Sequence, residues 1–279
     1  MHKAGTFSTV DAEGGIATPK ATSPSTFWTH LNEEVDPSQS VGPLAAFCFM
    51  TGYIDVISFS AIFVWCGFQT GNFAQLAIAL ARLFETRPEG SGHDTSFHMP
   101  DKQALTSLIA FNLGALVGRL GDRIGPHKRV WLIFGTFLQA LLTMAASATI
   151  YKSNMRSIAD ERADPSWTNV LAFACIAFMS ASLGVQGILG KRLNTQFTTT
   201  IVLTTVWVEL VTDPQLFNFR KMIKSRDHKL IAASSLFVGA FAGRAILGAI
   251  GAPAALGIGT GIRVLITLSW IFVPSKARR

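Results

Sequence analysis

The sequence predicts an all-α membrane protein that crosses the bilayer several times. Only 15% of its 279 residues are charged and 49% are hydrophobic, whereas an ordinary soluble domain has about 25% charged residues. The mean hydropathy is positive, at +0.37. Several apolar runs also reach the roughly 17–25 residues that a membrane-spanning helix requires. A soluble helical protein is the alternative, and the scarcity of charge argues against it.

Six apolar runs are long enough to cross the bilayer, and two are not. The long runs, in chain order, are residues 41–65, 104–120, 130–151, 169–190, 230–250 and 253–273. The short runs, 70–84 and 198–211, have about 14–15 residues, and each follows the first long run of its half. We expect them to be re-entrant or half helices, because a crossing needs about 20 residues. Eight crossings, with both short runs spanning the membrane, is the alternative.

The remaining residues form tails and loops around these runs. Residues 1–40 are rich in Ser, Thr, Pro and Gly and lack an apolar core, which predicts a disordered cytoplasmic tail rather than a signal peptide. The expected organisation is this tail, a first membrane repeat at 41–151, a loop at 152–168, a second repeat at 169–273 and a basic tail at 274–279.

The net charge of +7 reflects an asymmetry between the two sides of the membrane. With six crossings, 16 Lys and Arg residues fall on the side that holds both termini and 7 fall on the other side. The positive-inside rule then places both termini in the cytoplasm, in either the plasma membrane or an endomembrane. Eight crossings give the same distribution, so the predicted orientation does not depend on that choice. We therefore expect a lipid bilayer as the partner and no nucleic acid.

An internal repeat is indicated by a motif that occurs once in each half. Gly114-Ala-Leu-Val-Gly118-Arg119 matches Gly239-Ala-Phe-Ala-Gly243-Arg244. Glycines four residues apart form a strip that allows two helices to approach closely in lipid. The arginine that follows can reach the interface or bind an anion.

Weaker matches extend the repeat. They pair Gly52-Tyr-Ile-Asp55 with Gly184-Val-Gln186-Gly187, and Thr70-Gly71 with Thr204-Thr205. Three crossings in each half would place the halves upside down relative to each other, as in many secondary transporters. Four crossings in each half would instead give parallel repeats.

These motifs resemble the signature of the YoaK-like membrane proteins, the domain of unknown function 1275. The residues that carry the resemblance are Gly52 and Asp55, then Gln69-Thr70-Gly71-Asn72, Gly184-Val-Gln186, Lys191-Arg192, Val202-Leu203-Thr204 and Glu209. The run Asp213-Pro-Gln-Leu-Phe217 resembles fungal members, and the resemblance covers about residues 40–275. It implies a membrane fold and no particular substrate. Many members have Thr-Gly where this chain has Thr204-Thr205, so its two halves need not be equivalent.

Two acids, Asp55 and Glu209, lie in apolar stretches and are candidates for binding a substrate or an ion. An Asp at the centre of a spanning helix costs about 2.5–3.5 kcal/mol on insertion scales. Asp55 could couple transport to a proton or cation, or bind a substrate amine. It could equally be a structural group that is neutral or paired with an arginine. Arg263 lies deep in the last run, and Asp55 and Glu209 are its candidate partners.

The polar stretch Gln69-Thr70-Gly71-Asn72 is the other candidate site, with Thr204 as its counterpart in the second half. Gly71 can break the helix, and Thr70 and Asn72 can cap the short helix that follows. A helix that starts within the membrane presents unpaired N–H groups to an anion. The alternative is a capping turn at the interface. Gln186 is expected to form an interhelical hydrogen bond.

On these grounds we expect a small secondary transporter or permease with a polar cavity between the repeats. A structural or accessory membrane protein without transport activity is the second hypothesis. An enzyme acting on lipid ranks last, because no catalytic motif, metal site or cofactor motif is visible. The expected partners besides lipid are a small molecule or ion as substrate and a second copy of the chain.

Overall fold

The computed structural model describes residues 26–85, 95–161, 166–195, 197, 200–201, 203–218 and 220–276. The described chain is helical and contains no β-strand, which confirms the predicted fold class. The elements, in chain order, are α1 (Thr26–Asn32), the 3-10 helix η1 (Pro37–Gln39), α2 (Val41–Ile62), α3 (Gln69–Ala81), the 3-10 helix η2 (Arg82–Phe84), α4 (Met99–Gly118), α5 (Gly121–Ile124), α6 (Arg129–Ser153), α7 (Val170–Leu193), α8 (Leu203–Val211) and α9 (Lys224–Phe272).

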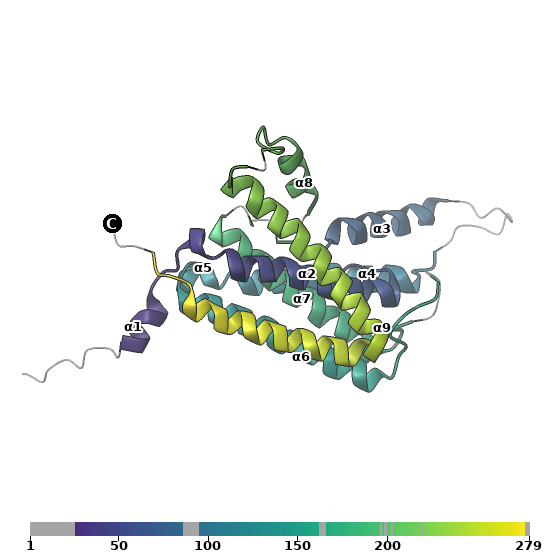
Figure 1. Cartoon of the computed structure of the whole chain (residues 1–279). Helices are drawn as coiled ribbons and strands as arrows, with labels where there is room; N and C mark the ends of the chain where they lie inside the picture. The colour runs from purple at the N-terminus through teal and green to yellow at the C-terminus, as the bar shows by residue number, and fades with distance from the viewer. Residues whose placement is uncertain are drawn as a thin grey trace, which may run out of the picture.

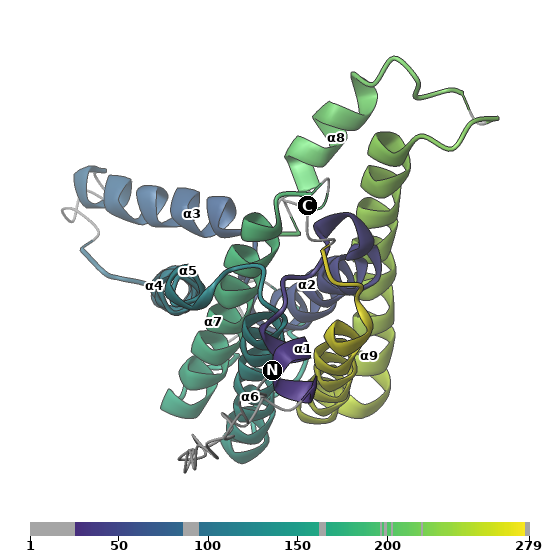
Figure 2. The same cartoon turned by 90° about the vertical axis from the view of Figure 1, so that its left-hand side faces the viewer.

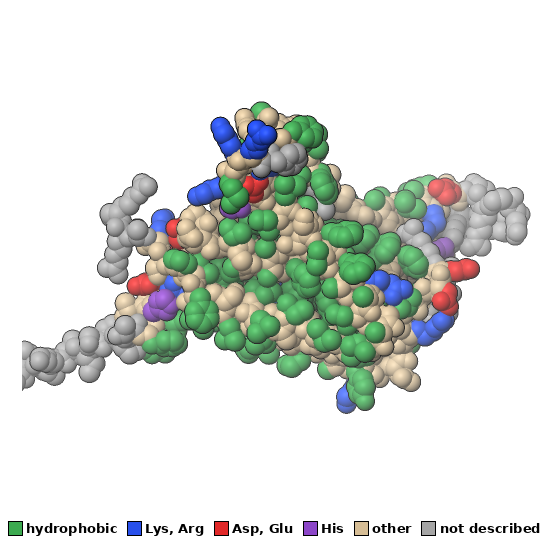
Figure 3. All heavy atoms as spheres, in the orientation of Figure 1, with side chains coloured by type: hydrophobic (Ala, Val, Ile, Leu, Met, Phe, Trp, Pro, Cys, Tyr) green, Lys and Arg blue, Asp and Glu red, His purple; other side chains and the backbone are tan. Residues whose placement is uncertain are grey.

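Five helical segments are long and apolar enough to cross a membrane, so the chain is a multi-pass membrane protein. They are α2, α4 with α5, α6, α7 and α9. Hydrophobic side chains cover the middle of the face shown in Figure 3, and most charged side chains lie toward its edges. Contact of such an apolar surface with hydrocarbon tails is favourable, whereas its contact with water is unfavourable.

Helix α9 has 49 residues and bends sharply at Gly251. A straight helix of that length would measure about 74 Å, more than twice the hydrocarbon thickness of about 30 Å. Gly251 has a φ of 79°, which a residue with a Cβ rarely adopts, and Pro253 cannot donate a backbone hydrogen bond. The hydroxyl of Ser157 accepts from Ala252 N at 2.8 Å and so pairs an N–H that the bend frees. The predicted runs 230–250 and 253–273 lie on the two limbs of α9 (Figure 1).

The two short apolar runs form short helices at the periphery of the bundle. Helices α3 and α8 have 13 and 9 residues, or about 20 Å and 14 Å of length, which is too short to cross a bilayer. Among the residues of α3, only Asn72 and Ala79 are buried. In Figures 1 and 2 both helices lie on the outside of the bundle, where α3 contacts α4 and α8 contacts α9.

Two glycine-mediated crossings hold the long helices together. Helix α2 crosses the first limb of α9, where a Cβ atom at Gly52 would collide with the carbonyl oxygen of Leu236, and one at Gly239 with that of Phe49. Helix α4 crosses α7 in the same manner, and there the glycines are Gly114 and Gly184. Helix α6 packs against both α7 and α9 and joins the two pairs (Figure 2).

Gly118 and Gly243, the second glycines of the repeated motif, lie at the same two crossings. A Cβ atom at Gly118 would come within 2.9 Å of the side chain of Ile188, and one at Gly243 within 2.9 Å of Val56. The glycine strips therefore contact other helices of the same chain.

Residues 26–40, which we expected to belong to a disordered tail, are ordered. Val35 is buried, and its N–H donates to the carbonyl of His127 at 2.9 Å. The N–H of Asp36 donates to Pro274 at 2.9 Å, and Lys276 donates to Glu34 at 2.8 Å. Composition gave no sign of this segment because its partners lie about 90 and 240 residues away along the chain. Residues 1–25 fall outside the described part.

We predict that Gly52→Ala destabilises the protein by about 1–3 kcal/mol, the usual cost of forcing extra volume into a packed contact. The reason is that the new methyl group must push α2 away from the backbone of α9. The midpoint of thermal unfolding in detergent, followed by tryptophan fluorescence, measures the effect. Gly261→Ala is the matched control, because no atom lies within 4 Å of the Cβ position there. Equal effects of the two substitutions would contradict the role of the crossing.

Candidate functional site

Asp55 lies in α2 with 1% of its surface exposed, and it holds the chain segment that follows α2. Helix α2 ends at Ile62, and residues 63–68 lead to α3. One carboxylate oxygen of Asp55, Oδ1, accepts from Cys66 N at 2.8 Å and from Gly67 N at 2.6 Å. The other oxygen, Oδ2, has no hydrogen-bond partner. The acid therefore pairs two loop N–H groups that would otherwise be buried without acceptors.

Gln69 and Asn72 bind the carbonyl groups of the same segment. Gln69 Nε2 donates to Cys66 O at 2.7 Å, and Asn72 Nδ2 donates to Trp65 O at 2.6 Å. Ser107 of α4 donates from its hydroxyl to Trp65 O at 2.7 Å and lies 2.9 Å from the Ser180 hydroxyl of α7. We call Asp55, Gln69, Asn72, Ser107 and Ser180 the loop cluster.

Thr70 and Gly71 do not belong to the loop cluster. Both are exposed at the start of α3, and the residue at the N-cap position is Phe68. Asn72 lies within the first turn and bonds to the preceding loop, so the expected capping by Thr70 and Asn72 is wrong. A cavity of about 170 Å³ borders Gly71 and Asn72 on the side of Phe59 and Trp65.

Arg263 is fully buried in the second limb of α9 and is surrounded by neutral polar groups. Its Nη1 donates to the side-chain oxygens of Gln139 and, at 3.3 Å, of Gln186. Its Nη2 donates to the Ser182 hydroxyl at 3.3 Å. Nε of Arg263 and the amide nitrogen of Gln139 form no hydrogen bond.

Gln186 connects Arg263 to α2 and to the segment after α7. Its Nε2 donates to Phe47 O at 2.9 Å and to the Thr51 hydroxyl at 2.8 Å. That hydroxyl in turn donates to Thr200 O at 3.0 Å. We call Thr51, Gln139, Ser182, Gln186 and Arg263 the arginine cluster.

The proposed pairing of Arg263 with Asp55 or Glu209 is wrong. Among the described residues, no carboxylate forms an ion pair with Arg263. Glu209 is 52% exposed and pairs with Lys229 at 3.4 Å. Thr204 is exposed too. Helix α8 lies outside the bundle, so an apolar neighbourhood in the sequence does not bury its polar side chains.

The remaining predicted positions divide between interior and surface. Gln186 forms interhelical hydrogen bonds, whereas Arg119 and Arg244 are exposed. Four residues of the two clusters were not predicted, because neutral polar side chains in apolar runs give a weaker signal than charged ones: Gln139, Ser182, Ser107 and Ser180. Ser182 and Gln186, four residues apart on α7, share one helix face, and that spacing was a usable signal.

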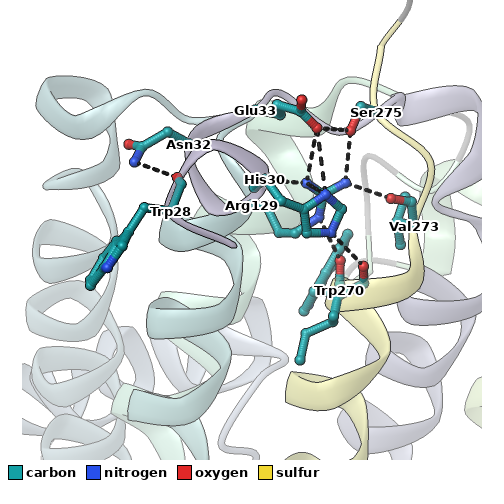
Figure 4. A network of polar contacts seen from close by, with 9 residues as sticks. Trp28, His30, Asn32, Glu33, Arg129, Trp270, Val273 and Ser275 are labelled. Carbon is teal, nitrogen blue, oxygen red and sulfur yellow. Dashed lines mark hydrogen bonds and ion pairs between the residues drawn. The ribbon is translucent and has the colours of Figure 1, made fainter. Parts of the chain in front are cut away.

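A third polar network lies at the end of the bundle where α1 and the C-terminal segment meet (Figure 4). Arg129, at the start of α6, is fully buried, and all three of its nitrogens are bonded. Nε donates to Trp270 O at 3.2 Å, Nη2 to Val273 O at 2.7 Å and Nη1 to His30 O. We call this network the terminal clasp.

Glu33 completes the terminal clasp at 3.7 Å from Arg129. A hydrogen bond from the Ser275 hydroxyl, with the charges of His30 and Arg129, holds the pKa of Glu33 below its ordinary value of 4.5. Because that pKa is lowered, the contribution of Glu33 to stability is present at neutral pH and is lost as pH falls through the folded-state pKa.

Comparison with known proteins places these clusters within one family. A family model described as "Protein of unknown function (DUF1275)" matches residues 44–269 and so covers the long helices and both interior clusters. No curated protein and no solved structure matches the chain.

We predict that Asp55→Ala is much more damaging than Asp55→Asn. Alanine leaves the N–H groups of Cys66 and Gly67 without an acceptor, at about 1–3 kcal/mol each. Asparagine keeps an oxygen in place of Oδ1 and removes a buried charge. Thermal unfolding in detergent should rank the two variants in that order. Equal losses would mean that the charge of Asp55, rather than its acceptor geometry, holds the loop.

We predict that Arg129→Met loosens the terminal clasp while the rest of the bundle stays protected. Hydrogen exchange measured by mass spectrometry should become at least about tenfold faster in residues 26–40, because hydrogen bonds to a charged group contribute about 1.5–3 kcal/mol each. Arg123→Met, at an exposed position in α5, is the control. Unchanged exchange in residues 26–40 would show that the backbone pairing holds them without Arg129.

Proposed function

The chain belongs to the DUF1275 family of membrane proteins, and from this we propose that it is a permease in which two inverted repeats enclose a polar site. The proposal includes six crossings, with the two limbs of α9 counted separately and α3 and α8 as half helices. It involves no chemical transformation of the substrate.

The two helix crossings support the repeat because their contacts correspond one to one. Gly52 meets Leu236 and Ala240, and Gly184 meets Phe111 and Ala115. Gly184 lies 132 residues after Gly52, while Leu236 and Ala240 each lie 125 residues after their counterparts. The contact of Gly239 with Phe49 corresponds to that of Gly114 with Ala181 through the same two offsets.

The pattern of these contacts supports a two-fold relation between the halves, and the three long helical segments in each half make that relation an inversion. The first helix of each half crosses the second long helix of the other half, so every contact occurs twice with the halves exchanged. A two-fold axis produces this relation, and in inverted-repeat transporters such an axis lies in the membrane plane, with the substrate site at the repeat interface.

The observation that carries the proposal is the contrast between two buried arginines. Arg129 and Arg263 are both fully buried. The N–H groups of Arg129 are paired with backbone carbonyls and a carboxylate. Those of Arg263 are paired only with neutral side chains, and its Nε is unpaired. Structural groups buried in proteins are usually fully paired. An incompletely paired charge inside a membrane bundle is expected at a substrate site.

The second candidate is a structural or accessory role, and the loop cluster favours it. Gln69, Asn72 and Ser107 each bond to the backbone of residues 63–68 or to one another. These residues fold the loop and hold α3 against α4 without any ligand. If the arginine cluster acted in the same manner, its polar groups would only lock helices together.

We predict that the purified protein speeds the permeation of at least one small solute into proteoliposomes, and that Arg263→Gln removes this effect. The measurement is the rate of osmotic re-swelling, by light scattering, in potassium formate, potassium nitrate, glycerol and urea, with valinomycin carrying potassium. Arg244→Gln, an exposed arginine on the same helix, is the matched control. Size-exclusion profiles establish that each variant is folded.

Two results would contradict the permease. Liposomes with protein could re-swell no faster than empty liposomes in every solute, or Arg263→Gln could keep the full rate. A loss of folded protein in Arg263→Gln, together with no transport by the wild type, would support the structural role.

A further inference from the structure

We propose that Arg263 binds a small carboxylate anion through the edge of its guanidinium formed by Nε and Nη2, with the Gln139 amide as a third donor. The inference rests on the proposed function for its role in transport. Binding itself can be tested without transport.

The hydrogen bonds of Arg263 leave one N–H at Nε and one at Nη2 without an acceptor. A guanidinium carries one N–H at Nε and two at each of Nη1 and Nη2. The oxygens of Gln139 and Gln186 account for both N–H groups of Nη1. Ser182 accepts from Nη2 and takes one of its two N–H groups, while Nε donates to nothing.

The available donors match a planar anion with two oxygens. Parallel N–H groups on one edge of a guanidinium form paired hydrogen bonds with a carboxylate. The amide nitrogen of Gln139 is also buried without an acceptor, and it belongs to a side chain already bonded to Arg263. The nitrogens left without an acceptor, Nε of Arg263 and Nε2 of Gln139, are both donors, so they favour an anion over a cation.

The charge balance of the bundle leads to the same ligand class. A buried ion is strongly unfavourable unless an opposite charge compensates it. Gln139, Gln186 and Ser182 are neutral, and no described carboxylate pairs with Arg263. A bound anion would supply the missing charge.

A chain of polar groups leads from Arg263 toward the end of the bundle that carries the terminal clasp. Gln186 donates to the hydroxyl of Thr51, which donates to the carbonyl of Thr200. The hydroxyl of Thr200 has no hydrogen-bond partner. The segment that contains Thr200 also contributes Asn194 and Phe197 to an open cavity of about 900 Å³.

Polar and charged side chains line this cavity: Lys224 and Lys276, Asp36 and Glu209, and His228. The cavity is the expected entrance for the ligand.

The test uses the detergent-purified full chain and formate as the probe. Potassium formate replaces potassium chloride at constant ionic strength, and the unfolding midpoint is followed by tryptophan fluorescence. Binding to the folded state should raise the midpoint saturably, by a few degrees. Arg263→Lys should weaken the apparent affinity at least about tenfold, since an ammonium lacks the paired donors. Arg244→Gln should leave the rise unchanged.

Gln139→Glu keeps the test decisive if Arg263→Lys fails to fold. A glutamate at this position retains the oxygen that bonds to Nη1 and places an internal carboxylate beside the guanidinium. The variant should unfold at a higher temperature than wild type without formate and should show no further rise with it. A formate-dependent rise that persists in Gln139→Glu would mean that formate binds elsewhere and would overturn the proposal.

The remaining outcomes separate this inference from the permease proposal. Sulfate that stabilises as well as formate, or no anion-dependent stabilisation at all, overturns the carboxylate site. Formate binding at Arg263 without re-swelling in any solute would support the carboxylate site and contradict the permease proposal. Protein-dependent re-swelling that occurs only in glycerol or urea would contradict the carboxylate site and support the permease proposal.

Discussion

The close approach of helix backbones at glycine is the constraint on which the rest of the bundle depends. In lipid there is no hydrophobic force between helices, so they associate through tight packing and interhelical hydrogen bonds. Gly184 presents bare backbone to α4, and Ser182 and Gln186 lie on the opposite face of α7, toward Arg263. The crossing therefore fixes both the packing of α7 and the direction of its polar face.

The chain segments that follow α2 and α7 are held by different contacts. Asp55 stands where the second half has Gly187, at the same 132-residue offset as Gly52 and Gly184. In the first half the acid binds the backbone of the following loop. In the second half the glycine lets Ile201 pack directly, since a Cβ at Gly187 would lie 2.6 Å from its side chain. Position 55 therefore holds its loop by hydrogen bonds, whereas position 187 contributes only a packing contact, and the hydrogen bond to the second loop comes from Thr51 of α2.

The sequence predicted the features that depend on local pattern. Long apolar runs became long helices, and the gap between the runs 230–250 and 253–273 coincides with the bend at Gly251. It failed where distant segments decide the outcome. The ordered segment at 26–40 depends on pairing with residues 127 and 274, and the exposure of Glu209 depends on where α8 docks. Gln139 gave no signal of its own, because a neutral amide within an apolar run becomes important only when Arg263 lies beside it.

How far each arginine lies from the end of α9 explains why the guanidinium of Arg129 is fully paired and that of Arg263 is not. The last four carbonyls of a helix have no partner within the helix. Arg129 reaches this group at the end of α9, where Trp270 and Val273 offer oxygens and the negative end of the helix dipole favours a cation. Arg263 lies in mid-helix, where neighbouring carbonyls already accept helical hydrogen bonds. Only side chains or a ligand can pair it there. The bundle supplies three side-chain oxygens and no carboxylate among the described residues, so the mid-helix position of Arg263 is what leaves its guanidinium incompletely paired.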